Sequence, residues 1–391
     1  MLSNLRILQG TALRSEVLYF TTEERPSDPS GLAPFCAAAH HATARRPYID
    51  FTVGERLLQR CAYLLRAVTN TPGHSYPFSA RYDAVGAGQL ILEHARRVEA
   101  DAVVLPGLLV HYAPSLARAG FLVIIDAPDV LSDLSRRFLL SEAPRSPLRT
   151  PGLFVNWLAC RSQERLFLKW CDEIWSTSMR EATRLREIEP NCPVLVVGNC
   201  LDQSAIPTTP LPSERRVGLL GTYSYAPNLR AAEHLAIEVF PRVLRRCPDA
   251  RLAIAGSGLP PGVERRLSAL GGVEVVGSVP DSGEFIRSCS VMALPIFVRG
   301  GVPLKLVEAM ACGRPVVASP ELVAGLPLSP GRDLMVAAGP TEFADCIADL
   351  LLDRMTASAM ATAARETFEK SFSLASVRAE VRNRSVLSRL G

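Results

Sequence analysis

Residues Phe297 to Ser319 read FVRGGVPLKLVEAMACGRPVVAS, a segment that joins a glycine-rich loop to a short helix and a buried strand. Gly300 and Gly301 carry no side chains that would obstruct a ligand, and Pro303 suits the first turn of a helix because it lacks an amide hydrogen. The unpaired N–H groups and the positive dipole end of that helix would face the loop, where Lys305 adds a full charge. Together these features predict a diphosphate site.

The predicted helix carries one acid, Glu308, and a lone carboxylate beside a diphosphate site suits the hydroxyl pair of a sugar. Gly313 is placed to end the helix, and Pro315 to Ala318 predict a buried parallel strand. The apolar residues of the helix can cover its buried side. They are Leu306, Val307, Met310 and Ala311.

The context of Glu308, LVEAMACGRPVVAS, resembles the signature of the group 1 glycosyltransferases, which are retaining enzymes of the two-domain GT-B fold. The resemblance implies that Glu308 binds the ribose hydroxyls of a nucleotide. The family usually has a second glutamate eight residues earlier, next to the transferred sugar, and this chain has Gly300 there. The departure affects either the usual sugar contact or catalysis itself.

Strand-like apolar runs alternate with amphipathic helical stretches along the chain, as is typical of doubly wound parallel sheets. The alternation predicts an α/β protein, and the resemblance implies the GT-B type, with two Rossmann-like domains that face a cleft. The first is expected over residues 1–205 and the second, which binds the donor, over residues 206–373. The helix of residues 374–391 is expected to pack back on the first domain. The polar, proline-containing segment Asp202 to Arg216 favours an interdomain linker.

The predicted strands restart after this linker. Those of the first half are EVLYFTT from Glu16, DAVVLPG from Asp101, FLVIIDAP from Phe121, EIWSTS from Glu173 and PVLVVGN from Pro193. Those of the second half are RVGLLGTYS, RLAIAGSG, VEVVGSV, SVMALPI and RPVVAS, with helices such as AAEHLAIEVFPRVLRR between them.

The resemblance covers Val217 to about Ser373, including the AGSG turn, the VxGxV strand and a closing FEKSFS that resembles the family's chain crossing. The first half is similar only through CDEIWSTS and VVGNCLD. A domain of this type should open with a strand and a glycine-rich turn, whereas this chain begins with a helix-like stretch, Leu2 to Leu13. An opening strand is therefore expected to be missing, either because the true start lies upstream of Met1 or because the domain is trimmed.

Ligands of open α/β sheets collect at the carboxyl ends of the strands, so we expect the donor between the domains, against the second one. Each strand of the second half ends in a loop that can line this site. A single glycine after a strand is common in any α/β protein, and only the order of these loops before Glu308 points to a ligand. The candidate donor-binding residues are Gly221, Thr222, Tyr223, Gly256, Ser278, Val279, Gly300, Gly301, Val302, Pro303 and Glu308.

The negative charge of a bound diphosphate requires a cationic side chain nearby. The family often offers an arginine and a lysine shortly after the first strand of this domain, where this chain has the uncharged GTYSYAPN. We therefore assign charge neutralisation to Arg299 and Lys305, since catalysis must stabilise the negative charge on the leaving diphosphate. The alternative is that Arg299 is only a solvated loop residue.

The first half of the chain offers fewer candidate catalytic or acceptor-binding residues than the second half. His111 follows the strand DAVVLPG, and related enzymes often have a histidine near the transferred sugar, but it is equally read as a packing or surface histidine. Asp126 and Asp129 end a predicted strand and are candidates either for an acceptor hydroxyl or for capping the next helix. His40 and His41 have no matching acids, so we expect no metal site.

The composition fits a globular protein, with 48% apolar and 21% charged residues. No run approaches the roughly 20 apolar residues that span a bilayer, and no secretory signal is recognisable, so a cytoplasmic location is expected. The ten cysteines lack metal-ligand spacing and are expected to be buried free thiols. A net charge of +4 does not indicate nucleic acid as a partner.

The stretch Arg145 to Trp170 mixes cationic with aromatic residues. Such a mixture can lie on an anionic membrane at the inner face, which would suit a lipid-linked acceptor. A helix with its apolar face on a sheet and its cations in solvent would look the same. Both interpretations stay open.

The sequence thus predicts a retaining glycosyltransferase, of the kind that builds polysaccharides. It would transfer a sugar from a nucleotide-sugar donor to a hydroxyl of a glycan, a lipid-linked molecule or a small natural product. Neither a cofactor nor a metal is expected, because the leaving diphosphate itself helps to take the acceptor proton in this family. The alternatives are a nucleotide-sugar epimerase of the same fold and a catalytically silent relative that binds a partner protein.

Overall fold

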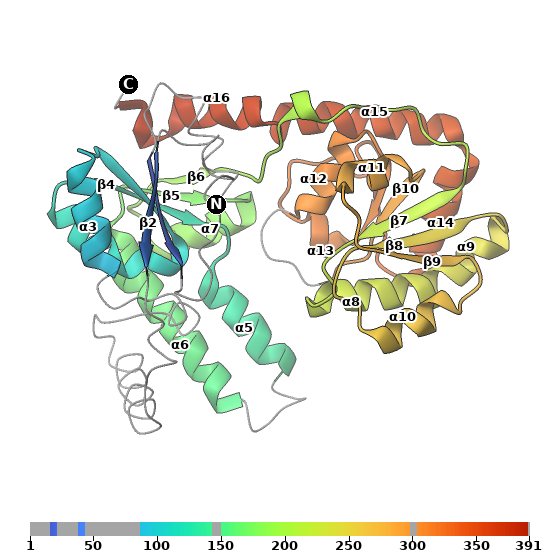
Figure 1. The fold of residues 1–391 in the computed structure, drawn as a ribbon, viewed down its shortest axis with the longest axis horizontal. Coiled ribbons are helices and arrows are strands. Elements are labelled where there is room, and N and C mark those ends of the chain that lie inside the picture. The colour runs from blue at the N-terminus through green and yellow to red at the C-terminus, as the bar shows by residue number, and fades with distance from the viewer. Residues whose placement is uncertain (1–15, 22–37, 44–86, 143–149, 298–302, 390–391) are drawn as a thin grey trace. The chain divides into compact units, whose positions relative to one another are not determined.

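The computed structural model describes residues 16–21, 38–43, 87–142, 150–297 and 303–389 of the chain (Figure 1). Contacts divide the chain into two compact units, which we describe separately. One comprises Met1–Val197 with Arg378–Gly391, and the other comprises Gly198–Val377. The expected helix Leu2 to Leu13, and with it the question of an opening strand, falls outside the described residues.

The second unit is built on a parallel sheet of six described strands, in the order β12-β11-β10-β7-β8-β9. If β7 to β12 are renumbered 1 to 6 and the sheet is read from β9, the order is 3-2-1-4-5-6, which is that of dinucleotide-binding sheets. All the strands predicted for the second half are confirmed, whereas β12 has two residues and was too short to predict. The strands are β7 (Arg216–Leu220), β8 (Arg251–Ala255), β9 (Val273–Gly277), β10 (Val291–Leu294), β11 (Val316–Ala318) and β12 (Met335–Val336).

Helices cover both faces of this sheet. In Figure 1, α8, α9 and α10 lie on one side of it, and α11, α12 and α15 lie on the other. The central strands are almost wholly buried, which explains their continuous apolar sequences. The helices are α8 (Ala226–Glu233), the π-helical η8 (His234–Val239), α9 (Phe240–Arg246), α10 (Pro261–Ser268), α11 (Ser282–Arg287), α12 (Leu304–Ala311), α13 (Pro320–Val323), α14 (Pro340–Leu352) and α15 (Arg354–Ser371), preceded by the 3₁₀ turn η7 (Gln203–Ala205).

Residues 303–319 of the quoted segment fold as predicted. Pro303 stands just before α12, and its carbonyl accepts from the N–H of Leu306 at 3.0 Å. Gly313 has a φ of +61°, and its N–H donates to the carbonyl of Met310 at 3.0 Å, so the helix ends there in the left-handed conformation that glycine adopts easily. Strand β11 then pairs in parallel with β10.

Arg314, in the same segment, fixes the backbone around Thr209 within the second unit. Its side chain is fully buried, and its Nη atoms donate to the carbonyls of Thr209 at 2.9 Å, Arg287 at 2.9 Å and Gly313 at 3.0 Å. Burial lowers the pKa of the guanidinium from its usual range. Further along, the expected crossing at FEKSFS is found as a bridge from Leu201 to Ser373.

The loops that end β7, β8 and β9 are packed backbone to backbone. The N–H of Gly221 donates to the carbonyl of Ala255 at 3.0 Å, and the N–H of Gly256 donates to the carbonyl of Gly277 at 2.7 Å. Gly256 has a φ of +127°, and a Cβ atom there would stand 1.8 Å from the carbonyl oxygen of Gly221. Only glycine fits this position.

The first unit contains a parallel sheet in the order β3-β4-β5-β6, and all four strands confirm the sequence prediction. They are β3 (Ala102–Pro106), β4 (Leu122–Ala127), β5 (Glu173–Ser176) and β6 (Val194–Val196). The helices are α3 (Ala87–Arg97), η4 (Gly107–Tyr112), α4 (Ala113–Arg118), α5 (Leu131–Glu142), α6 (Thr150–Phe167), η6 (Leu168–Trp170), α7 (Met179–Ile188), α16 (Leu374–Arg384), which crosses the unit boundary, and η9 (Val386–Arg389).

The predicted strand EVLYFTT is present as β1 (Glu16–Thr21), but its expected place in the doubly wound sheet is wrong. It pairs in parallel with β2 (Ala38–Thr43), and within the described residues the two form a sheet of their own. The sequence of β2, AAHHAT, has neither an apolar run nor an alternating pattern. Its pairing depends on backbone hydrogen bonds, which leave no side-chain signal in the sequence.

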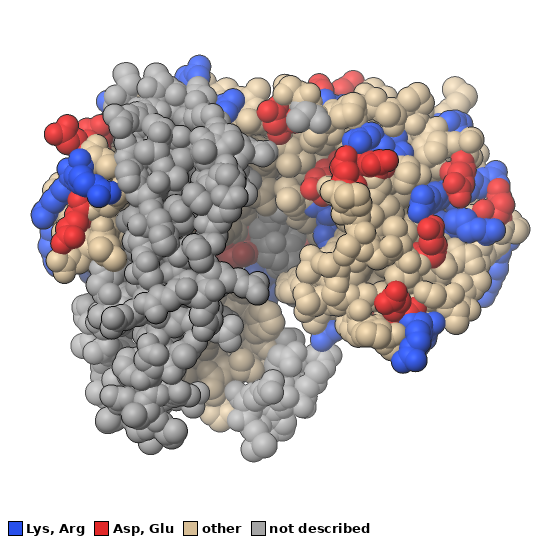
Figure 2. Space-filling view, in the orientation of Figure 1, with Lys and Arg blue, Asp and Glu red and all other residues tan. Residues whose placement is uncertain are grey.

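The eight described cysteines are all free and buried, as expected. Across the described part of the chain, no helix combines the length and the apolar character needed to cross a membrane. On the face of the second unit drawn in Figure 2, cationic and acidic side chains are interspersed.

Glu173 fixes the C-terminal segment to the first unit. Its carboxylate is buried and accepts from the indole N–H of Trp175 at 2.5 Å, from Ser385 Oγ at 2.6 Å and from the N–H of Val386 at 2.9 Å. The carboxylate thus joins β5 to the turn that follows α16. Three buried donors share this one acceptor group.

We predict that Glu173→Ala lowers the free energy of unfolding of the first unit by about 2–4 kcal/mol, because it leaves buried donors without an acceptor. Hydrogen exchange at the Val386 amide should accelerate, and urea unfolding should begin earlier. Glu380→Ala removes an exposed carboxylate of α16 whose ion pair joins it to Arg384, and it should cost no more than about 0.5 kcal/mol. Equal exchange rates in the two variants would contradict the assigned role of Glu173.

A second prediction concerns the packed loops of the second unit. Gly256→Ala should destabilise this unit by more than about 3 kcal/mol, because the methyl group collides with a backbone oxygen that cannot swing away. Gly262→Ala is the matched control, since nothing lies within 4 Å of its added Cβ and it stands in α10. Thermal unfolding of both variants tests this, and a Gly256→Ala protein as stable as the control would refute the close approach.

Candidate functional site

The strand order of the second unit defines where a ligand would bind. Strands β7 and β10 are neighbours, and the chain leaves β7 toward β8 on one side and β10 toward β11 on the other. Loops diverge at such a switch point and leave a crevice at the carboxyl ends of the strands. The loop that starts at Gly221 and Pro303 at the start of α12 flank this point. Arg299, Gly300, Gly301 and Val302 lie outside the described residues.

The loop after β7 is fixed by internal hydrogen bonds. The carbonyl of Thr222 accepts from the N–H of Tyr225 at 3.3 Å and from Asn228 Nδ2 at 2.9 Å. The side chain of Thr222 is exposed. Tyr223, however, is only 2% exposed, and its hydroxyl donates to the carbonyl of Ala255 at 2.9 Å. The hydroxyl of Tyr223 therefore holds the loop together.

Lys305 reaches from α12 to the start of α8. Its Nζ atom donates to Asn228 Oδ1 at 2.8 Å, while the amide nitrogen of Asn228 donates to the Thr222 carbonyl. Lysine, asparagine and loop thus form a continuous chain of hydrogen bonds across the switch point. Burial lowers the pKa of the Lys305 ammonium to about 8, and the negative charge of Glu308 opposes this shift.

Glu308 lies one turn further along α12, beside the start of α11. Burial raises the pKa of its carboxyl from the usual value, and the charge of Lys305 and a hydrogen bond from Ser282 act against that shift. The side chain is partly buried, while its neighbours Val307 and Ala309 are fully buried against the core. The amphipathic pattern of α12 therefore keeps this carboxylate at the edge of the core, where a hydroxyl-rich ligand can reach it.

The loop after β9 supplies the remaining expected contacts. Ser278 is exposed, whereas Val279 is partly buried and packs against the hydrophobic core. The hydrogen bond from Gly256 to Gly277 ties this loop to the one that ends β8. Ser278 thus follows the edge strand, two strands away from β7.

The candidate residues of the first unit follow the carboxyl ends of adjacent parallel strands. His111 is on η4, after β3, and its ring lies 4.0 Å from that of Tyr112, centre to centre. Asp126 is the residue before the end of β4 and Asp129 stands shortly before α5, both partly buried. The paired strands β3 and β4 bring these three residues to one edge of their sheet.

Two features of the second unit were missed by the sequence analysis. Asn228 stands in the quoted GTYSYAPN, but its contact with Lys305 joins residues 77 positions apart. The long predicted helix is also interrupted by the π-helical η8, a feature common near functional sites. There the ring of His234 meets that of Phe297 edge to face at 5.2 Å. A shallow pocket of about 440 Å³ lies beside these two rings.

Comparisons with known proteins agree with this geometry. Residues 214–353 match the family model Glycosyl transferases group 1. A segment of 155 residues, 37% of this chain, is 28% identical to the GDP-mannose-dependent monoacylated alpha-(1-6)-phosphatidylinositol monomannoside mannosyltransferase of Corynebacterium glutamicum. That alignment spans 41% of the relative's length.

Solved structures share the fold over nearly the whole chain. Anabaena HepE, in complex with UDP and glucose, superposes with a TM-score of 0.59 at 14% identity, covering 94% of this chain and 98% of HepE. Sucrose-phosphate synthase from Thermosynechococcus elongatus superposes with a TM-score of 0.68 at 15% identity, covering 99% and 91% of the two chains. Residues 214–353 thus match the group 1 glycosyltransferase family model, and the chain as a whole shares the GT-B fold of these structures.

Proposed function

We propose that this protein transfers a sugar from a nucleoside diphosphate sugar to an acceptor hydroxyl. The observation that carries the proposal is the chain of contacts from Lys305 through Asn228 to the Thr222 carbonyl, at the switch point of the donor-type sheet. It provides a cation where the loop after β7 has none. Glu308 on the same helix supplies the acceptor group that a ribose diol requires.

Lys305 is proposed to stabilise the diphosphate as it leaves. Lys305 is partly buried, so its attraction for a phosphate oxygen is stronger than that of an exposed lysine. The hydrogen bond to Asn228 holds the charge in place before the donor binds, which reduces the reorganisation that transfer requires. Arg299 remains a proposed second cation from the adjoining loop.

Glu308 is proposed to bind the ribose. A carboxylate accepts two hydroxyl hydrogens at once when ionised, and the nearby Lys305 favours the ionised form against the effect of burial. Gly300, in the position of the family's second glutamate, offers no carboxylate to the transferred sugar. We infer that backbone groups of residues 300–303 and the side chain of Ser278 take over part of that contact.

The finer features of the reaction are also proposals. GDP-mannose is the first donor to test, because the relative that matches in sequence uses it, while the more distant structural neighbours share the fold alone. We propose retention of configuration, no resident metal or cofactor, and an acceptor bound at the edge of the first unit's sheet near His111, Asp126 and Asp129. A glycan, a lipid-linked molecule and a small molecule remain candidate acceptors, the second of which would bring the protein to a membrane surface.

Removing the carboxylate of Glu308 tests the donor site. Glu308→Ala should weaken binding of the nucleoside diphosphate about tenfold to a hundredfold, because it removes hydrogen bonds to a charged acceptor. Calorimetry with GDP, UDP, ADP, TDP and their sugars measures this. Glu321→Ala, which removes an exposed acid from α13, should bind as the unchanged protein does.

The transfer reaction is measured as the release of nucleoside diphosphate in the presence of each of a panel of acceptors. If no nucleotide or nucleotide sugar binds the unchanged protein, the donor site is wrong. If a donor binds but is neither transferred nor hydrolysed, the proposed activity fails while nucleotide binding stands.

The pH dependence of donor binding is a further prediction. Lys305 is charged below its pKa of about 8, so affinity for the diphosphate should be full below pH 8 and should fall as the pH rises above it. Lys305→Met should bind weakly at every pH and lose this dependence. Lys370→Met, an exposed lysine of α15, is the control and should keep the dependence. A Lys305→Met profile that still falls near pH 8 would assign the effect to another group.

A further inference from the structure

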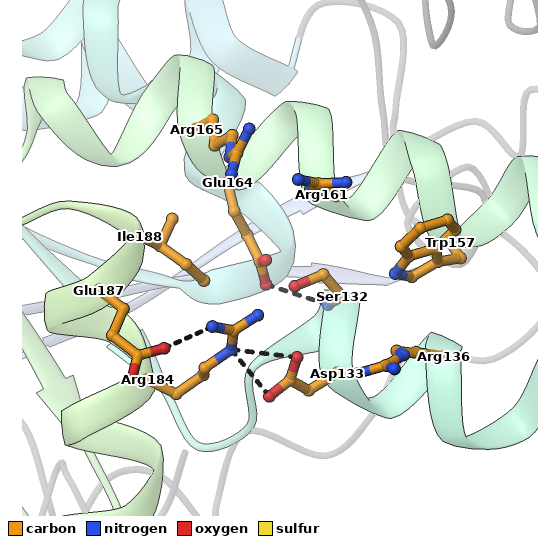
Figure 3. A pocket seen from close by; sticks show the side chains of 10 residues that line it. All are labelled: Ser132, Asp133, Arg136, Trp157, Arg161, Glu164, Arg165, Arg184, Glu187 and Ile188. Carbon is orange, nitrogen blue, oxygen red and sulfur yellow. Dashed lines mark hydrogen bonds and ion pairs between the residues drawn. The ribbon is translucent and has the colours of Figure 1, made fainter.

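A pocket of about 240 Å³ lies within the first unit, where α5, α6 and α7 meet (Figure 3). Four arginines line it: Arg136 from α5, Arg161 and Arg165 from α6, and Arg184 from α7. Three helices thus present cationic side chains to one small space. The pocket shares no residue with the donor site and does not depend on the proposed transfer reaction.

The arginines differ in how their charge is balanced. Arg184 is neutralised, since its Nε lies 3.1 Å from Asp133 Oδ2 and its Nη1 pairs with Glu187. Arg136, Arg161 and Arg165 form no ion pair with any residue of the described ranges. Arg161 instead stands over the ring of Trp157, 5.7 Å from its centre. The pocket therefore keeps an excess of positive charge.

Glu164 faces this pocket with one oxygen unused. Its side chain is 5% exposed, and its Oε1 accepts from the N–H of Ser132 at 3.2 Å. Its Oε2 is buried and has no hydrogen-bond partner in the described part of the chain. In Figure 3 the carboxyl group points into the pocket, toward the guanidinium of Arg184. A buried acceptor without a donor is unfavourable, so a ligand that brings a hydrogen is expected there.

We propose that this pocket binds a phosphate group, free or as the monoester end of a larger ligand, and that a shared proton joins the phosphate to Glu164. Arginine forks match the geometry of phosphate oxygens and supply its counter-charge. A phosphate near neutral pH keeps one hydrogen to donate to the Glu164 carboxylate. Sulfate has none, so it binds only when Glu164 itself carries the proton.

The surroundings of Glu164 place this proton exchange near neutral pH. Burial raises the pKa of its carboxyl to about 7, the negative charge of Asp133 acts in the same direction, and hydrogen bonds from Ser132 and from the backbone of Leu131 oppose both. Asp133 and Glu187 are the other acids that line the pocket, and both are paired with Arg184. Glu164 is therefore the acid of the pocket that changes charge.

Calorimetry on the full chain tests the proposal with inorganic phosphate and with sulfate, each below and above pH 7. Phosphate should bind at both pH values, whereas sulfate affinity should fall about tenfold for each pH unit above 7. Glu164→Gln keeps an oxygen for the Ser132 N–H and adds an amide donor, so it should make sulfate binding independent of pH. Sulfate that binds equally at both pH values to the unchanged protein would overturn the shared proton.

Charge variants separate this pocket from general attraction to a basic surface. Arg161→Gln and Arg165→Gln should each weaken phosphate binding about tenfold, as expected for a lost hydrogen bond between charged groups. Arg180→Gln removes an equally exposed arginine of α7 that does not line the pocket, and it should have no effect. Equal losses in all three variants, or no binding of millimolar phosphate to the unchanged protein, would overturn the proposal.

Vesicles distinguish the two sources of the phosphate. Sedimentation with vesicles that contain phosphatidic acid, compared with phosphatidylcholine alone, measures headgroup binding. Binding that free phosphate displaces and that Arg161→Gln weakens supports the pocket with a lipid monoester as its ligand. Phosphate binding without vesicle binding supports the same pocket with a soluble ligand.

Discussion

The pairing of β10 with β7 is the constraint on which the candidate donor site depends. These strands join in parallel through Val291 with Val217 and through Met292 with Gly218, and the sheet then extends in opposite chain directions on either side. The reversal separates two loops that would otherwise fill the space between the strands. It also sets α8 and α12 close enough for Lys305 to reach Asn228. The position of the candidate site is thus a result of strand order, which brings side chains of α8 and α12 together beside the switch point.

Much of this fold could be predicted from the sequence, because buried parallel strands are continuous apolar runs and their ends are marked by glycine. Gly256 illustrates both the success and its limit. The sequence indicated a loop there, but the reason for the glycine is the carbonyl of Gly221, which belongs to another strand end. The strands β2 and β12 were missed because one is polar and the other has two residues. A periodic apolar pattern indicates a buried strand, and neither of these strands has enough apolar residues to form such a pattern.

The side-chain roles were harder to predict, because they depend on contacts between distant segments. Tyr223 and Thr222 are adjacent and both polar, yet one faces the core and the other faces solvent. Lys305 was identified as a cation near the diphosphate, but the asparagine that holds it was not. In this chain the loop after β7 is uncharged and the charge comes from α12. A comparison with the family position by position shows that the cationic residues of this loop are missing. It does not show that Lys305, from α12, reaches the same place.

Two buried charged residues show how a structural role is separated from a ligand role. Arg314 is completely buried without a carboxylate, and its Nε has no hydrogen-bond partner in the described residues, but both of its Nη atoms donate to backbone carbonyls and so fix the segment around Thr209. Glu164 is buried to a similar degree and is also without an ion pair in the described residues, but one of its oxygens has no donor and faces a space lined by arginines. Desolvation opposes both charges, and the contacts of the Nη atoms offset it for Arg314, whereas the unpartnered oxygen of Glu164 faces a space that a ligand can enter. The uncompensated oxygen is the reason that the pocket between α5, α6 and α7 is expected to hold something other than protein.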